Sequence, residues 1–236
     1  GVENLARLPE LKKKLLWTFL LVAVYRIGVH VPVPGVDSAA LADFFESAKN
    51  TLFGLFDMFS GGGLRNLSIF ALGIMPYISA SIIIQLLTVV SPELSKMQKE
   101  GGAAGKKKIT QYTRYGTVLI TVIQGFGIAV GLESMASPTG APVVLMAGWA
   151  FRLMTIITLT AGTVFLMWLG EQMTERGIGN GISLIIYSGI VAGQPRAVLS
   201  TFALIKAGEL SPFVLILIIA LMLGVLVAIV FMECGQ

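Results

Sequence analysis

One long apolar stretch of the sequence, residues 52–90, is interrupted twice. Three consecutive glycines at 61–63 make the first break, and the turn sequence Gly73-Ile74-Met75-Pro76 makes the second. In hydrocarbon, an interrupted helix leaves backbone N–H and C=O groups unpaired at a cost of several kcal/mol each, so such a break is tolerated only where protein or water surrounds it. We therefore expect a short re-entrant helix followed by a membrane-crossing helix, beside an internal cavity or pore.

The composition is that of a polytopic membrane protein. Of the 236 residues, 55% are hydrophobic and 13% are charged, and the mean hydropathy is +0.84, which lies outside the range of soluble domains. Several apolar windows are long enough, or nearly so, to cross a hydrocarbon layer of about 30 Å. They cover residues 15–31, 74–90, 117–132, 149–169, 178–192 and 213–232. The sequence therefore predicts an all-α membrane protein, a polytopic helical bundle with one crossing for each window.

Lysine and arginine are unevenly distributed between the loops that these windows define. Of the 17 basic residues, most lie on the side that holds both termini, while Arg26 falls inside the first window. Because the more basic loops usually stay in the cytoplasm, we expect the N-terminus and residue 236 on the cytoplasmic side. The lysines flank apolar spans in short loops, so anionic lipids are the expected partner and nucleic acid is not. Cys234 is the single cysteine, which excludes a disulfide within the chain.

Two long motifs lie at the ends of expected spans. Residues 68–85 have the sequence SIFALGIMPYISASIIIQ, and residues 170–183 have the sequence GEQMTERGIGNGIS. Arg26-Ile27-Gly28 followed by Pro32-Val33-Pro34-Gly35, and Gln111-Tyr112-Thr113-Arg114-Tyr115-Gly116, complete the pattern. In this order the motifs closely resemble the SecY/Sec61α family of protein-conducting channels, in its bacterial form, over essentially the whole chain.

The resemblance implies a fold and a division of the chain. Members of the family have ten spans in two pseudo-symmetric halves, and this sequence ends where the large cytoplasmic loop after the sixth span would begin. We therefore expect the first half of such a channel, with a re-entrant plug half-helix. The expected parts are a cytoplasmic amphipathic segment (1–14), the first channel half with spans 1 to 5 and the plug (15–193), an external connection (194–212), and the sixth span with the start of the next cytoplasmic loop (213–236).

The implied function is that of the central pore-forming subunit of the Sec translocon in the bacterial cytoplasmic membrane. Such a subunit passes unfolded secretory proteins across the membrane and releases membrane-protein segments laterally into it. The implied partners are the small subunits SecE and SecG, the SecA ATPase or a ribosome, and a preprotein with its signal sequence as substrate. No cofactor is expected, because the energy source lies in the partners and the sequence has no phosphate-binding loop of Walker type.

Four isoleucines are the expected constriction of the pore. Ile74 and Ile78 are four residues apart, as are Ile182 and Ile186, so each pair shares one helix face. Spacing alone favours lipid-facing or core positions in so apolar a chain. The resemblance instead implies a ring at mid-membrane. A narrow ring of branched aliphatic side chains tends to dewet, so it can block ions and still pass an extended peptide.

The resemblance implies two further groups of site residues. The first is a plug, a short helix folded back into the outer funnel, formed by Asp57, Met58, Phe59, Ser60, Gly61, Gly62, Gly63, Leu64, Arg65, Asn66, Leu67 and Ser68. From the residues alone, an ordinary glycine-capped surface turn is an equal alternative. The second is a lateral gate formed by Met75, Ser79, Ile82, Gln85 and Gln124. Because an unpaired buried glutamine costs about 1–3 kcal/mol, we expect the two glutamines to form a polar latch, although an isolated membrane glutamine ordinarily just bonds a neighbouring helix.

Two other classes of protein fit the expected number of spans. A rhomboid-like intramembrane protease needs a Gly-x-Ser-Gly sequence and a histidine base, but Ile186 stands at the first motif position before Ser188-Gly189, and the only histidine, His30, belongs to the outer end of the first span. We therefore expect no enzyme activity.

A secondary transporter, or a channel for small solutes, is the open alternative. Transporters usually place coupling-ion ligands inside their spans, but no acidic residue lies inside any expected span here.

Overall fold

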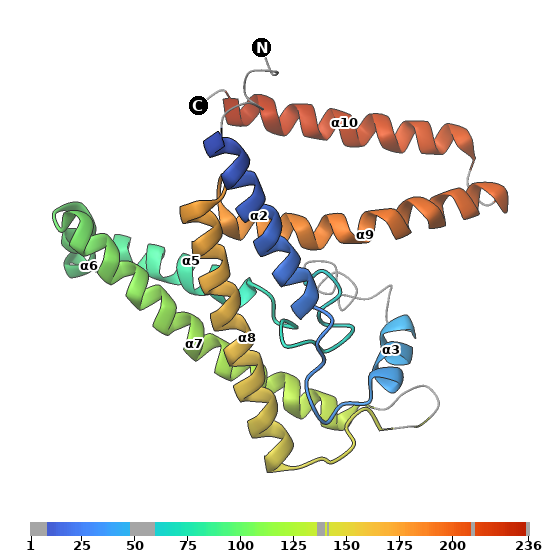
Figure 1. Ribbon diagram of the computed structural model, residues 1–236, viewed down its shortest axis with the longest axis horizontal. Helices are drawn as coiled ribbons and strands as arrows, with labels where there is room; N and C mark the ends of the chain where they lie inside the picture. Colours follow the sequence, from blue (N-terminus) through green and yellow to red (C-terminus); the bar gives the residue numbers. More distant parts are fainter. Residues whose placement is uncertain (1–8, 48–59, 136–139, 141, 209–210, 235–236) are drawn as a thin grey trace. The chain divides into compact units, whose positions relative to one another are not determined.

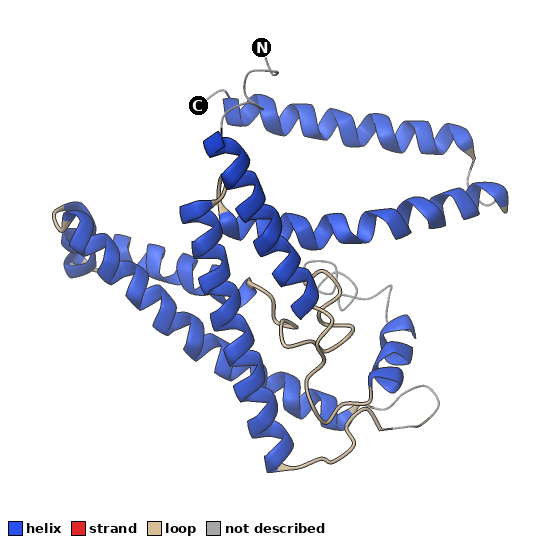
Figure 2. Ribbon diagram, in the orientation of Figure 1, coloured by secondary structure: helices blue, strands red, loops and turns tan. Residues whose placement is uncertain are grey.

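The computed structural model describes residues 9–47, 60–135, 140, 142–208 and 211–234. These residues form α-helices and, within the described ranges, no β-strand, only isolated β-bridges (Figure 1, Figure 2). The predicted all-α fold is therefore confirmed over this part of the chain. The helices are α2 (Pro9–Gly28), α3 (Ser38–Ser47), α5 (Met75–Val90), α6 (Pro92–Lys99), α7 (Gly102–Ser134), α8 (Trp149–Arg176), α9 (Gly181–Lys206) and α10 (Pro212–Cys234).

The chain divides into two compact units, Gly1–Ala192 and Gly193–Gln236. The division falls within α9, just before Pro195. An interior proline removes one helical hydrogen bond, so the helix is intrinsically weak at this point. α9 nevertheless continues to Lys206, whereas the sequence predicted a window that ends at residue 192. The segment after Pro195 is rich in alanine and leucine, which favour helix and let it resume.

Four helical segments of the described chain are long and apolar enough to cross a membrane. They are Gly102–Ser134, Trp149–Arg176, Gly181–Ala203 and Phe213–Cys234. α5 has 16 residues and qualifies only together with α6, to which it is bent by 101°. α2 does not qualify, because lysines 12–14 and Arg26 leave only a short apolar stretch between them.

Of the six predicted crossings, the described residues therefore contain four, or five if the bent pair counts as one span. The window at 74–90 matches α5, Met75–Val90, to within one residue. The window at 15–31 runs three residues past the end of α2 at Gly28, into a turn. Hydropathy does not distinguish an apolar turn that is covered by protein from an apolar helix.

The side chain of Phe70, called the aromatic wedge below, joins the turns before α5 to α2 and α8. Phe70 stacks on Tyr25 of α2, with ring centroids 6.1 Å apart, and on Phe165 of α8, with centroids 5.9 Å apart. Two glycines make room for it. A methyl group at Gly28 would overlap the ring of Phe70, and one at Gly162 would overlap the carbonyl of Ile69. The wedge thus depends on two helix surfaces that lack side chains.

The long helix α7 packs against α5 and α8 through small side chains. Thr113, Thr117 and Thr121 are buried at successive four-residue steps. Each hydroxyl donates to the carbonyl four residues earlier, at 3.1, 2.8 and 2.7 Å respectively. Small residues let helix backbones approach closely in a membrane, and the internal hydrogen bonds remove the cost of the buried hydroxyls.

Two antiparallel bridges join the chain after α2 to other loops: Pro32 pairs with Ser68 in the turns before α5, and Val36 pairs with Val144 between α7 and α8. At the first bridge, the N–H of Val33 donates to Leu67 at 2.8 Å, and the N–H of Ile69 donates to the carbonyl of Val31 at 2.9 Å. These bonds pair backbone groups that a helix would otherwise pair internally. The turns before α5 are therefore fixed by backbone bonds as well as by packing.

Replacing Gly162 by alanine is expected to lower the thermal unfolding midpoint of the full-length protein in detergent. The added methyl group would overlap the backbone of Ile69, and overpacking of this kind typically costs about 1–3 kcal/mol. Gly127→Ala on α7 is the matched control, because no atom lies within 4 Å of where its Cβ would stand. Equal midpoints for the two variants would contradict the wedge.

Candidate functional site

The first unit contains a cavity of about 640 Å³. Its lining includes members of all three groups of predicted site residues. They are Ile74, Ile78 and Ile186 of the ring, Ser60, Leu64 and Leu67 of the plug, and Met75, Ser79 and Gln124 of the gate. The structure thus brings together residues that are more than one hundred positions apart in the sequence, and it does so at one mostly apolar space.

The four isoleucines of the predicted ring belong to one hydrophobic cluster. Ile74 is 4% exposed, and Ile78, Ile182 and Ile186 are partly buried against the same cluster. Ile182 does not line the cavity but contacts α8 at Gly170. Isoleucines of an ordinary hydrophobic core would also form such a cluster. Three of these four differ from core isoleucines because they also line the cavity.

The predicted plug is only partly described, since residues 57–59 lie outside the described ranges. Residues 60–67 form consecutive turns and Ser68 forms a bridge, in place of the short helix that was expected. Gly61 has a φ of +65°, Gly62 of +87° and Leu67 of +38°. Because right-handed helix needs negative φ throughout, these residues prevent helix formation in this part of the segment.

Two side chains of α2 reach the turn at residues 60 and 61. The hydroxyl of Tyr25 donates to the carbonyl of Ser60 at 3.1 Å, and Nη1 of Arg26 donates to the carbonyl of Gly61 at 3.0 Å. Sequence reasoning gave neither residue a role here, because the partners are 35 positions apart. The only sequence evidence was that Arg26, a charged residue, lies inside an apolar window.

The predicted gate residues lie on the neighbouring helices α5 and α7. Met75 is 40% exposed and Ile82 is 51% exposed, and Gln85 and Gln124 are exposed as well. Gln85 approaches Ser81 of its own helix at 3.5 Å, and no bond between the two glutamines is present in the described chain. The expected polar latch is therefore not formed within the described residues and stays a prediction. The gate residues form an open face that begins at the cavity.

The turn between α8 and α9 sets the position of the second isoleucine pair. A Cβ at Gly181 would overlap the carbonyl of Gly170, so the two backbones touch. The hydroxyl of Thr174 donates to Gly170 at 2.9 Å and accepts from the N–H of Gly181 at 2.9 Å. The side chain of Asn180 accepts from the N–H groups of Ile182 and Ser183 at 3.0 and 3.4 Å, which caps the start of α9.

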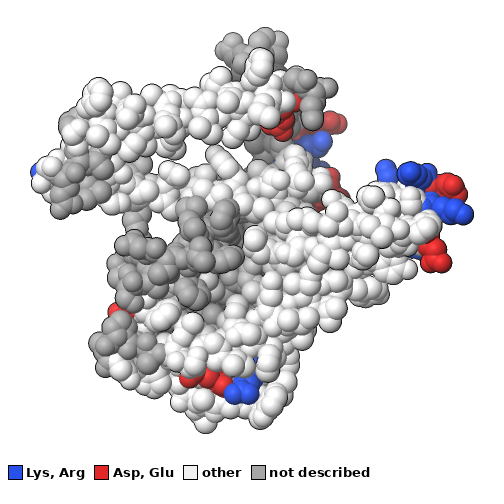
Figure 3. All heavy atoms as spheres, turned by 180° about the vertical axis from the view of Figure 1, so that it is seen from behind, with Lys and Arg blue, Asp and Glu red and all other residues white. Residues whose placement is uncertain are grey.

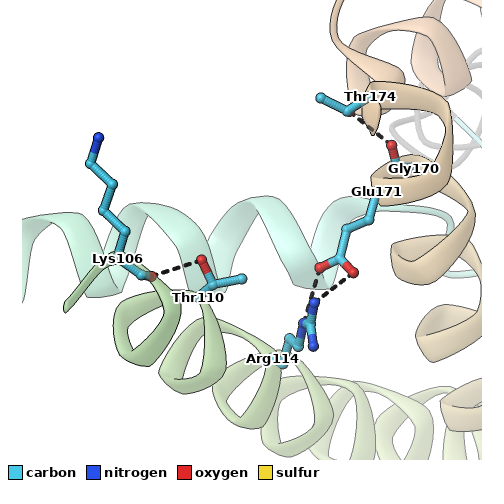
Figure 4. A network of polar contacts seen from close by, with 6 residues as sticks. All are labelled: Lys106, Thr110, Arg114, Gly170, Glu171 and Thr174. Atoms are coloured by element: carbon cyan, nitrogen blue, oxygen red, sulfur yellow. Dashed lines mark hydrogen bonds and ion pairs between the residues drawn. The ribbon is translucent and has the colours of Figure 1, made fainter. Parts of the chain in front are cut away.

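An ion pair joins α7 to α8 near the same turn. Nε and Nη2 of Arg114 donate to the two carboxylate oxygens of Glu171 at 3.0 and 2.7 Å (Figure 4). The arginine side chain is 46% exposed, so the pair contributes at most about 1 kcal/mol. Its bidentate geometry nevertheless fixes the orientation of one helix against the other. The partners are 57 positions apart, and nothing in the sequence pairs them.

Charged side chains are sparse on the surface. In the space-filling view they gather in a few groups, and most of the visible surface carries none (Figure 3). Among the described residues, no group of three or more His, Cys, Asp or Glu side chains could hold a metal ion. The chemistry available at the cavity is therefore that of an apolar surface with a few neutral polar groups.

Comparison with known proteins gives the family. A family model described as SecY matches residues 68–236 of the chain. The chain belongs to the SecY family. The resemblance stated from the motifs is thereby confirmed, and the membership favours a translocation channel over a secondary transporter or a classical enzyme.

Curated relatives and solved structures agree with this membership. Protein translocase subunit SecY of Escherichia coli strain K12 is 52% identical over 229 residues, which are 97% of this chain and 51% of that protein. The subunit of the same name from Aquifex aeolicus is 47% identical over 232 residues, 98% of this chain and 54% of that protein. The chain thus spans about half the length of these relatives.

Two solved structures share the fold. They are titled "Sec61 in the Canine ribosome-channel complex from the endoplasmic reticulum" and "The structure of a protein conducting channel". Each has a TM-score of 0.53 to this chain at 19% identity, and the match covers 76% of this chain and 36% of that structure's chain. At this identity the similarity shows the fold alone.

Replacing Asn180 by alanine is expected to loosen the first turn of α9. Loss of an asparagine cap costs about 1 kcal/mol, so the amides after it should exchange hydrogen roughly five-fold faster. Hydrogen–deuterium exchange of peptides that cover residues 181–187 in the full-length protein measures this. Asn180→Asp is the control, because it keeps the acceptor and should exchange at the original rate. An unchanged rate in the alanine variant would contradict the cap.

Proposed function

We propose that the chain forms the first half of the central pore subunit of the Sec translocon, a channel for unfolded secretory proteins. The observation that carries this proposal is a cavity whose lining includes three of the ring isoleucines together with residues of the turn segment and of the gate. Family membership gives the class of protein, and the cavity supplies a place where that activity can occur. The activity belongs to the whole channel, of which this chain supplies about half.

The isoleucine cluster is proposed to act as the seal. Ile74, Ile78 and Ile186 present branched aliphatic side chains to the cavity, and Ile182 is held beside them by the packing of α9 on α8. An apolar neck of this kind excludes water and therefore hydrated ions. Aliphatic side chains make no directional bonds, so they can yield to an extended polypeptide of any sequence.

The segment at 57–68 is proposed to act as the plug. In the described part, Ser60, Leu64 and Leu67 face the cavity together with the isoleucines. Its described residues, 60–68, form turns and one bridge and no helix. Non-helical segments can open at a smaller free-energy cost than core helices do. Its departure would join the cavity to the outer side.

The faces of α5 and α7 are proposed to form one side of the lateral gate. Met75, Ser79 and Gln124 line the cavity, and Ile82 and Gln85 continue the same side of α5 as exposed residues. An apolar segment in the cavity could therefore leave along an apolar surface. A polar latch would need Gln85 and Gln124 to find partners on helices beyond this chain.

The expected partners and location follow from this function. The parts at 1–14, 15–193, 194–212 and 213–236 keep the roles given from the sequence, with both ends on the cytoplasmic side of the bacterial inner membrane. SecE and SecG would cover the outer faces of the helices, and the SecA ATPase or a ribosome would supply the driving force. The lysines of α6 and of the start of α7 are proposed to meet anionic lipids.

Ile78→Asn and Ile182→Ser are each expected to raise the resting ion conductance of the full-length channel in a planar bilayer. A polar side chain lets water enter the apolar neck, and ions follow the water. Ile83→Asn on α5 is the matched control, because that side chain is 48% exposed and lies outside the cluster. Currents unchanged by both substitutions, or raised equally by the control, would count against the ring.

A further inference from the structure

The last turn of α2 makes a paired contact with the glycine turn of the plug segment. Tyr25 is 1% exposed, and its hydroxyl donates to the carbonyl of Ser60 at 3.1 Å. The next residue, Arg26, donates from Nη1 to the next carbonyl, that of Gly61, at 3.0 Å. Two adjacent side chains on one helix therefore hold two adjacent carbonyls of one turn.

The same turn also contacts α9. A Cβ at Gly61 would lie 2.8 Å from the Cα of Gly189 and 3.0 Å from Nη1 of Arg26. Gly61 also has a φ of +65°, a conformation that other residues rarely adopt. The turn therefore meets both the side chains of α2 and the backbone of α9, three residues beyond Ile186 of the ring.

The residues of this turn form part of the wall of the cavity. Ser60 lines the cavity, and its hydroxyl accepts the N–H of Leu64 at 3.0 Å. Leu64 lines the same cavity. The bonds from α2 thus reach the cavity wall directly at Ser60, and they reach Leu64 through one further hydrogen bond.

Arg26 makes the stronger of the two contacts with the turn. A hydrogen bond from a charged donor is worth more than one from a neutral hydroxyl. A guanidinium inside an apolar window also needs partners, which the carbonyl of Gly61 supplies. We propose that Tyr25 and Arg26 are positioning residues that keep the plug turn seated against α9, with Arg26 the dominant contact. This inference rests on the proposed role of residues 57–68 as the plug.

The test measures the position of the turn in the full-length channel in membrane vesicles. Leu64→Cys serves as the reporter in a background without other cysteines, in which Cys234 is replaced by serine. A membrane-impermeant maleimide added from the outer side labels the reporter at a rate that rises when the turn leaves its seat. Arg26→Gln should increase this rate on the order of ten-fold, and Tyr25→Phe roughly three-fold.

Controls separate seating of the turn from loss of charge or loss of fold. Lys13→Gln removes the same charge from the same helix and should leave the labelling rate unchanged. Tyr25→Phe removes a single oxygen and keeps the buried ring, so it tests the contact even if Arg26→Gln does not fold. Unchanged labelling in the variants of Tyr25 and Arg26 that fold, or an equal increase with Lys13→Gln, would overturn the inference.

The conductance of Ile78→Asn distinguishes this inference from the proposed function. Suppose that Ile78→Asn raises the conductance but the variants of Tyr25 and Arg26 are labelled at the original rate. The proposed channel is then supported, and the positioning role of Tyr25 and Arg26 is overturned. If instead those variants are labelled faster and Ile78→Asn conducts no more ions than the original protein, the positioning role is supported and only the isoleucine ring is overturned.

Discussion

Backbone groups that leave a helix at membrane depth must find partners within the protein, because hydrocarbon supplies none. Residues 60–74 meet this requirement in three ways. Their own turns pair some of the groups, the bridge at Pro32 pairs others, and Tyr25 and Arg26 pair the carbonyls of residues 60 and 61. The segment can therefore remain non-helical between α2 and α8, and its end places Ile74 at the cavity.

The position of the isoleucines depends on where helix backbones lack side chains. Gly28 and Gly162 admit the wedge of Phe70, which precedes Ile74 by four residues. Gly170 and Gly181 let α9 begin in contact with α8, which sets Ile182 and Ile186. Both isoleucine pairs are thus placed by close backbone approach. The side chains of the proposed seal need only be aliphatic and branched, while the glycines fix where they meet.

Much of this arrangement could be predicted from the sequence. Apolar windows gave the all-α fold and most of the helices, and the long motifs gave the family, which the comparisons confirm. The motifs also named isoleucines that gather in one cluster in the structure. These successes share one cause. Periodicity and long motifs report on properties of contiguous residues, and helices are contiguous.

The failures involve contacts between distant residues or backbone conformation. Left-handed φ values at Gly61 and Leu67 turned the expected plug helix into turns over the described part, and hydropathy does not report φ. Arg26 and Gly61, like Arg114 and Glu171, meet only through the fold. Gln124 is exposed among the described residues, and hydropathy does not report which neighbours cover a side chain.

Site-specific photo-crosslinking to an arrested preprotein tests most directly whether the clustered isoleucines line the path of a translocating chain. A photoreactive amino acid would replace Ile78 or Ile186 in the full-length channel, and Ile157 of α8, which is 67% exposed, would serve as the reference position. Covalent adducts with the preprotein are predicted at Ile78 and Ile186 and not at Ile157. Adducts absent from both ring positions, or equally strong at Ile157, would contradict a path through this cluster.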